Sequence, residues 1–244
     1  MTSASPEAVT GETPPYRPHV GPTRQYIRDI ILGVNDGLVS IFLLVVGVVG
    51  GGFAAREVLL AGLTASVAGA ISMAAGEYIA TKSQEEVFDS EMELEREHLR
   101  YHRDVEREEI REMFGDMGLS TVDVEHIVEA LDSDDEVFMK VMMALEFGVV
   151  EEERRSPVKA GFLSGLLFLA GSLPSVLPFV FIDRTGVGVA VAAIASGVAL
   201  FAVGVAKTFT TRKHPIRSGF ENVAIATAGA LLAFAVGSLY DTYA

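Results

Sequence analysis

Long apolar segments alternate with polar ones along the chain, and they set the predicted architecture. Each apolar segment has about 20 or more residues, the length of a helix that crosses the hydrocarbon core of a bilayer. The five segments are Ile27–Phe53, Val58–Ala80, Val158–Ile182, Gly186–Ala206 and Gly219–Tyr240. All are rich in Gly, Ala and Ser, which let membrane helices approach closely. The sequence therefore predicts five transmembrane helices in a tight bundle.

A long polar segment separates the second and third apolar segments. Its first part, KSQEEVFDSEMELEREHLRYHRDVEREEIREMF, contains no Gly or Pro and consists largely of good helix formers. This composition predicts that the second membrane helix continues unbroken from Arg56 to Phe114. Such a helix would be about 90 Å long at 1.5 Å per residue.

Two shorter helices are predicted after the glycines of GDMGLS. The segment STVDVEHIVEALDS has Ser120 or Thr121 as its N-cap, and SDDEVFMKVMMALEFGVV has Ser133 or Asp134, with acidic residues in its first turn. The predicted fold class is all-α: a polytopic membrane protein with a three-helix polar domain inserted between spans 2 and 3.

These patterns divide the chain into four parts. Residues 1–23 form a polar, proline-rich tail, 24–81 carry spans 1 and 2, 82–155 form the inserted domain, and 156–244 carry spans 3–5. The first twenty residues lack a basic segment followed by an apolar core and a small-residue cleavage site. They therefore favour a disordered tail over a signal peptide.

The negative charge is concentrated in residues 82–155. This segment holds 24 Asp or Glu and 9 Lys or Arg, and the whole chain has a net charge of −14, so the remainder is nearly neutral. A field of this sign repels nucleic acid and attracts cations. Cysteine is absent, so metal ligands must be carboxylate, imidazole, thioether or backbone oxygen, which suit Mg2+, Ca2+, Mn2+ or Fe2+ better than structural zinc.

Basic residues lie at one end of the predicted spans. They are Arg17, Arg24 and Arg28 before the first span, Arg154, Arg155 and Lys159 before the third, and Lys207, Arg212, Lys213 and Arg217 between the fourth and fifth. Loops rich in Lys and Arg stay in the cytoplasm. This predicts a cytoplasmic N-terminus and acidic domain, with the C-terminus on the opposite side.

Three polar or polarizable side chains inside the first two spans are candidates for a transport pathway. A carboxylate such as Asp36 costs about 3 kcal/mol within a membrane helix, so it should face protein or water, unless it is hydrated at the interface. Met73 and Glu77 are four residues apart and share one helix face, where they would offer one soft and one hard ligand. The alternatives are a core-filling methionine and an interfacial glutamate.

The acidic helix carries a stripe of potential metal ligands within about 80° of one another. Its members are Glu91, Glu95, His98, His102, Glu106 and Glu109. In the third polar helix, Met142, Met143 and Glu146 recur at helical spacing. One interpretation is a metal site completed by Glu146. The other is a solvated acidic face beside a methionine-rich packing face.

Other chemistries have weaker support. Glu95 and His98 have the Glu-x-x-His spacing of di-iron bundles, but the chain contains only one such motif. There is no nucleotide-binding fingerprint, so transport would have to draw on an ion gradient.

The motifs NDGLVSIFLLVVGVVGG, GAISMAAGEYIATKSQEE and VMMALEFGVVEEERRSPVKAGFLSGLLFLAGSLPSVLPF, with the acidic insertion between the second and third, resemble the vacuolar iron transporter family. The resemblance is collinear from about Arg24 to Tyr240. It implies a homodimer with five spans per protomer and a cytoplasmic metal-binding domain. It also implies antiport of Fe2+, and often Mn2+, out of the cytosol against protons.

The resemblance also implies roles for individual residues. The family's pore aspartate and methionine fall on Asp36 and Met73. A second-span glutamate of some members falls on Ala65, so its role is either missing here or moved, with Glu77 as the candidate. Its metal-domain ligands fall on Glu95, Glu106, Glu109, Glu146, Met142 and Met143, with His98 at one glutamate position. Glu91 and His102 are additional candidates from the stripe.

We therefore expect a proton-coupled Fe2+ and Mn2+ exporter, not an enzyme, with no prosthetic group. Zn2+ and Co2+ share the same ligands. The expected partners are a second copy, the lipid bilayer, metal ions and protons, and no nucleic acid. The membrane would be the plasma membrane in a prokaryote and the vacuolar membrane in a eukaryote. The alternatives are a membrane-anchored di-iron oxidase or iron store, and a non-transporting acidic scaffold or sensor.

Overall fold

The structure is a computed structural model that describes residues 23–146, 154–208 and 214–243. Within these ranges the chain forms α-helices and no strand, which confirms the all-α prediction. The helices are α1 (Thr23–Gly50), α2 (Ala55–Tyr101), α3 (Arg103–Asp116), α4 (Thr121–Asp132), α5 (Asp135–Glu146), α6 (Pro157–Val176), α7 (Pro178–Phe181), α8 (Thr185–Ala206) and α10 (Pro215–Tyr243). The tail predicted for residues 1–23 lies outside the described residues except for Thr23.

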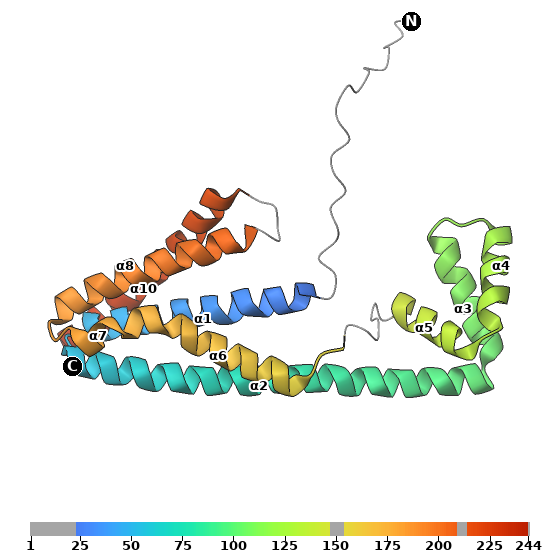
Figure 1. Ribbon diagram of the computed structural model, residues 1–244, viewed down its shortest axis with the longest axis horizontal. Coiled ribbons are helices and arrows are strands. Elements are labelled where there is room, and N and C mark those ends of the chain that lie inside the picture. Colours follow the sequence, from blue (N-terminus) through green and yellow to red (C-terminus); the bar gives the residue numbers. More distant parts are fainter. Residues whose placement is uncertain (1–22, 147–153, 209–213, 244) are drawn as a thin grey trace, which may run out of the picture.

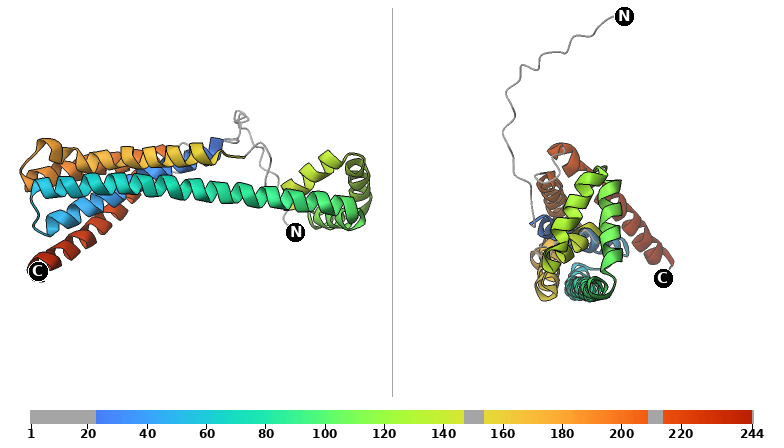
Figure 2. Two further views of the ribbon diagram at one scale, coloured as in Figure 1. Left: turned by 90° about the horizontal axis from the view of Figure 1, so that it is seen from below. Right: turned by 90° about the vertical axis from the view of Figure 1, so that its right-hand side faces the viewer.

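The helices form two regions joined by α2 (Figure 1). The first region is a bundle of α1, α6, α7, α8, α10 and the apolar half of α2. The second half of α2 extends away from this bundle and carries α3, α4 and α5 at its far end (Figure 2). We call this second region the polar unit. The C-terminus lies at the end of the bundle that is remote from the polar unit.

Five helices are long and apolar enough to cross a membrane, as the sequence predicts. They are α1, α2, α6, α8 and α10. The third span is shorter than predicted: α6 ends at Val176 and a separate turn of helix, α7, follows from Pro178. Pro178 has no backbone N–H to donate, so it cannot continue the hydrogen bonds of α6, which favours an interruption at this point.

Small residues lie where the bundle helices cross, as predicted. A Cβ atom at Gly37 in α1 would lie 2.1 Å from the carbonyl oxygen of Phe168 in α6, and one at Gly171 in α6 would lie 2.3 Å from that of Val34 in α1. No side chain fits at such distances, so the two backbones are in direct contact. This contact fixes α1, with its Asp36, against α6.

The prediction of one unbroken helix from Arg56 to Phe114 is wrong. α2 ends at Tyr101, His102 leaves the helical conformation with φ −133° and ψ 30°, and α3 begins at Arg103 and turns away (Figure 1). Leu99 and Ile110, on opposite sides of this break, are both buried in the apolar core of the polar unit. Their burial in a common core favours the turn although no Gly or Pro marks it.

The two shorter helices begin where the sequence predicts. The Ser120 hydroxyl accepts a hydrogen bond from the backbone N–H of Asp123, at 3.3 Å, at the start of α4. The Asp134 carboxylate accepts hydrogen bonds from the N–H groups of Glu136 (2.9 Å) and Val137 (3.3 Å) at the start of α5. These contacts satisfy N–H groups that lack partners within their own helices.

Candidate metal site

The polar unit has an apolar core that determines which acidic side chains are buried. The core contains Leu99, Ile110, Val124, Val128, Phe138 and Met142. Glu95 precedes Leu99 by one helical turn, and Glu106 precedes Ile110 by one turn. Residues four apart share a helix face. The faces that bury Leu99 and Ile110 therefore carry the two carboxylates inward with them.

Glu95, His98 and Glu106 form a compact group. Each offers one potential ligand atom, and these atoms lie within 4.8 Å of one another. Nδ1 of His98 is 3.1 Å from Oε1 of Glu106. The two glutamates are almost fully buried, with 4% and 2% of their surfaces exposed, whereas His98 is partly exposed. The group therefore consists of two buried carboxylates and one solvent-accessible imidazole.

Two carboxylate oxygens in this group have no hydrogen-bond partner among the residues that the structure describes. They are Oε1 of Glu95 and Oε2 of Glu106, and both are buried. A buried polar atom without a partner is costly, and an ionised carboxylate is more costly still. A divalent cation would supply the missing interaction, and carboxylate with imidazole is a ligand set that Fe2+, Mn2+ and Zn2+ accept. The residues present therefore fit a divalent metal ion.

The electrostatics identify which other acids face this group. Burial, together with the nearby carboxylates Glu106, Glu146 and Glu109, raises the pKa of Glu95 to about 8. Burial also raises the pKa of Glu146, with contributions from Glu109, Glu106 and Glu91. A carboxyl with a pKa near 8 carries a proton at neutral pH, so a metal ion that binds Glu95 has to displace that proton.

The other predicted ligands differ in how exposed their side chains are. Met142 is completely buried in the apolar core, and Met143 is also buried, with 4% of its surface exposed. His102 is exposed at the break between α2 and α3, and its ring lies edge-on to His98 with 6.2 Å between centroids. Glu91 and Glu109 are partly buried, and Glu146 is exposed at the end of α5.

The arginines of α3 lie on contacts with the other helices of the polar unit, a feature that the sequence did not reveal. Nε of Arg103 is 2.7 Å from Oδ1 of Asp132, and Nε of Arg111 is 2.8 Å from Oε1 of Glu125. Both acceptors belong to α4. These arginines therefore hold α3 against α4 and do not neutralise Glu95 or Glu106 directly.

In the bundle, the three pathway candidates have different surroundings. Asp36 is half-buried in α1 and accepts a hydrogen bond from the Ser40 hydroxyl at 3.0 Å. Met73 packs against the apolar cluster of the bundle. Glu77 is ion-paired with Arg155, with 3.5 Å between Oε1 and Nη1, and it is 3.5 Å from the Thr81 hydroxyl. The ion pair with Arg155 was not predicted from the sequence.

A second unpredicted polar contact involves Asn35, the residue before Asp36 in α1. The side-chain amide of Asn222 in α10 donates to Oδ1 of Asn35 in α1 at 3.3 Å, and its oxygen accepts from Nζ of Lys207 at 3.2 Å. These three residues join α1, the end of α8 and α10. Amide and ammonium groups buried between membrane helices need such partners.

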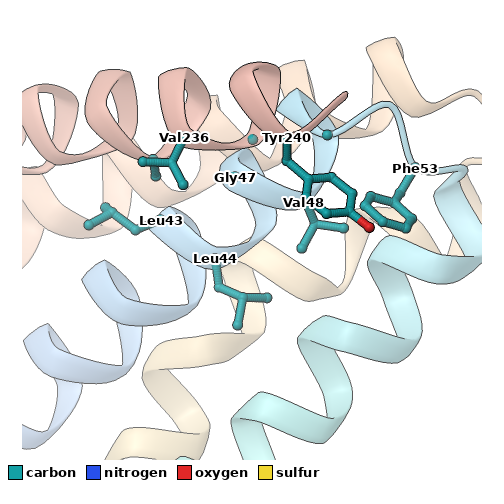
Figure 3. A pocket seen from close by; sticks show the side chains of 10 residues that line it. Leu43, Leu44, Gly47, Val48, Phe53, Val236 and Tyr240 are labelled. Atoms are coloured by element: carbon teal, nitrogen blue, oxygen red, sulfur yellow. The ribbon is translucent and has the colours of Figure 1, made fainter. Parts of the chain in front are cut away.

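An apolar groove lies between α1 and α10 at the end of the bundle remote from the polar unit (Figure 3). Leu43, Leu44, Val236 and other apolar residues line it, and Phe53 stacks on Tyr240 with 6.2 Å between ring centroids. The lining contains no carboxylate or imidazole. Its chemistry excludes this groove as a metal site.

Comparison with known proteins identifies relatives along most of the chain. The model of the VIT family matches residues 27–238. The chain is 30% identical over 215 residues to vacuolar iron transporter 1 of Arabidopsis thaliana, covering 88% of this chain and 86% of that protein. It is 32% identical over 211 residues to vacuolar iron transporter 2 of Oryza sativa subsp. japonica, covering 86% and 85% of the two chains.

Proposed function

This chain belongs to the VIT family and is an integral membrane metal-ion transporter, not an enzyme; from this premise we propose that it exports Fe2+ and Mn2+ from the cytosol in exchange for protons. The observation that carries the choice of cargo is the buried group of Glu95, His98 and Glu106 with its two unpartnered oxygens. Iron is the cargo named for the relatives above.

The polar unit is the proposed capture site. Glu95, His98 and Glu106 bind the ion, and Glu109 and Glu146 add negative charge next to it. A field of several carboxylates raises the local concentration of cations. The protonation of Glu95 makes capture reversible, because protons and metal compete for the same oxygens.

A homodimer with a pathway between α1 and α2 of the two protomers is the proposed route across the membrane. Asp36 and Met73 receive the ion, and Asp36 exchanges it for protons. The outer face of α2 is exposed in a single chain, with Leu60, Val67 and Ile71 each more than half exposed. Such a face requires lipid or a second protomer to cover it.

The proposed orientation places the polar unit in the cytoplasm. The arrangement in Figure 1 supports this, because the basic residues Arg28, Arg155 and Arg217 belong to helix ends that point toward the polar unit, and the C-terminus lies at the other end. Cytoplasmic ends of membrane helices are the ones enriched in Lys and Arg.

Transport of Fe2+ into proteoliposomes with an imposed pH gradient tests the function. We expect flux that depends on the gradient and that Asp36→Asn reduces by about 100-fold or more, because an amide cannot exchange a metal ion for a proton. Asp183→Asn, at an exposed site between α7 and α8, is the matched control and should leave flux unchanged. Undiminished flux in Asp36→Asn would contradict the role of Asp36. Oxygen consumption with Fe2+ but no flux would favour an oxidase.

A further inference from the structure

Arg155 lies at the junction of the bundle and the polar unit, immediately before α6. Its guanidinium is ion-paired with Asp29 of α1 and with Glu77 of α2, at 3.5 Å from the latter. Only 10% of its side-chain surface is exposed. One buried cation therefore connects three membrane helices at the end that faces the polar unit.

Of the two carboxylates that Arg155 contacts, Asp29 is buried and Glu77 is partly buried. The side chain of Asp29 is 6% exposed and that of Glu77 is 20% exposed. Two carboxylates in such a place need a compensating positive charge. Arg28 contributes to Asp29 from the surface, at 3.4 Å and with 72% of its side chain exposed, whereas Arg155 contributes from within.

These carboxylates lie one or two helical turns from Asp36 and Met73, the residues of the proposed pathway. Asp29 precedes Asp36 by seven residues, so the two lie on one face of α1, two turns apart. Glu77 follows Met73 by one turn of α2. Asp29 and Glu77 thus lie between the polar unit and the pathway, at the position where an ion leaving the capture site would enter the membrane.

The backbone at Arg155 is anchored independently of its guanidinium. Its N–H donates to Oε1 of Glu85 at 3.4 Å. The neighbouring Arg154 is ion-paired with Glu85 (2.6 Å) and Asp89 (2.8 Å), and its guanidinium lies 5.0 Å from the ring centroid of Phe88. The segment is therefore fixed to α2 even when the long Arg155 side chain changes position.

We propose that Arg155 is the counter-cation at the entrance of the pathway, which Asp29 and Glu77 form and which we call the mouth. Arg155 neutralises these two carboxylates when no metal is present, and an incoming divalent cation displaces its guanidinium. This inference rests on the proposed transport function and adds a positioning residue to it. The guanidinium occupies the place of a metal ion without blocking it permanently, because its backbone anchor lies on another set of contacts. Because the metal ion has to displace the guanidinium, its net affinity for the mouth is lowered, and it can leave again toward Asp36 and Met73.

The test compares Arg155→Gln with Lys82→Gln in the full-length protein, reconstituted for Fe2+ transport. Both variants remove one positive charge, and Lys82 is an exposed residue of α2 whose ion pair with Glu86 lies outside the proposed site. In Arg155→Gln the two carboxylates lose their internal competitor, so we expect KM for Fe2+ to fall by about tenfold and the maximal rate to fall with it. Lys82→Gln should keep the KM of the unmodified protein. Equal KM values in the two variants would overturn the proposal.

A compensating variant separates charge compensation from a structural role. Glu77→Gln combined with Arg155→Gln removes one charge of each sign, so the mouth keeps its net charge. We expect it to fold and to have a KM closer to the unmodified protein than that of Arg155→Gln alone. If the double variant fails to fold, or matches the single variant, Arg155 is a structural clamp and the proposal is wrong. Absence of gradient-driven flux in the unmodified protein would instead overturn the transport function, and this inference with it.

Discussion

Two pairs of carboxylates, each with one member on α2, are shielded from solvent and differ in how their charge is balanced. Glu95 and Glu106 in the polar unit have oxygens without hydrogen-bond partners, and their nearest base is the partly exposed His98. Asp29 and Glu77 at the end of the bundle share the guanidinium of Arg155. The first pair leaves its charge to be balanced by a proton or a metal ion, whereas the second pair carries its own cation. The contrast indicates tight capture in the polar unit and weaker transit in the membrane.

The largest effect is expected from removing the first pair, Glu95 and Glu106. In the double variant Glu95→Gln and Glu106→Gln, the site loses both carboxylate ligands, so we expect the Kd for Mn2+ to rise by about 100-fold or more. Isothermal titration of the purified full-length protein measures this. Glu129→Gln, an exposed residue of α4, is the control and should bind as the unmodified protein does. Unchanged binding in the double variant would place the capture site elsewhere.

The same variant should be more stable without metal. Buried, uncompensated carboxylates oppose folding, and neutral amides of similar shape remove this repulsion. At a pH above about 8, where Glu95 is ionised, we expect the metal-free melting temperature of the polar unit to rise by several degrees, about 4–8 °C for 1 kcal/mol in a unit of this size. Circular dichroism at 222 nm is a suitable measurement. A lower melting temperature would show that the carboxylates stabilise the unit even without metal.

Protons and metal ions compete for the carboxylate of Glu95. The pKa of Glu95 is raised from 4.5 to about 8, so in that range the folded chain binds more protons at this residue than the unfolded chain does. Its contribution to the free energy of unfolding therefore decreases as pH rises from about 4.5 to about 8. Metal binding follows the opposite trend, because it requires the ionised carboxylate.

Titrations between pH 6 and pH 9 test this. We expect the Kd for Mn2+ to fall by up to about tenfold per pH unit below pH 8 and to level off above it, as one proton is displaced. In Glu95→Gln the slope should be smaller by about one proton. An unchanged slope in that variant would show that another group supplies the proton.

Much of the fold follows from the sequence, because the apolar segments and the caps are local signals. The spans and the N-caps Ser120 and Asp134 require only information from neighbouring residues. The break at His102 does not, because it depends on Leu99 and Ile110 being buried in one core. On an unbroken helix Glu95 and Glu106 would be about 16 Å apart along the axis at 1.5 Å per residue. The turn instead brings their ligand atoms to within 4.8 Å.

The pairing of arginines was likewise beyond the sequence. Arg154 and Arg155 are adjacent and look alike as positive charges flanking a span, yet one pairs with exposed Asp89 and the other with buried Asp29. Orientation rules count such residues without distinguishing them. Only the packing of α1 and α2 against the start of α6 determines which arginine lies inside.

The smallest expected effect concerns the ion pairs that hold the polar unit together. Asp132 of α4 is 2.7 Å from Nε of Arg103 and 3.5 Å from Nη1 of Arg107, and all three side chains are about a quarter to a third exposed. Ion pairs with this exposure are screened by solvent and contribute little. We therefore expect Asp132→Asn to lower the melting temperature by only about 1–3 °C, and by less at 1 M salt. The Kd for Mn2+ should stay unchanged, because these pairs lie outside the group of Glu95, His98 and Glu106. A weakened Mn2+ site in this variant would mean that the ion pairs position the metal ligands. The ion pairs of Asp132 and the carboxylates of the metal site would then not act independently.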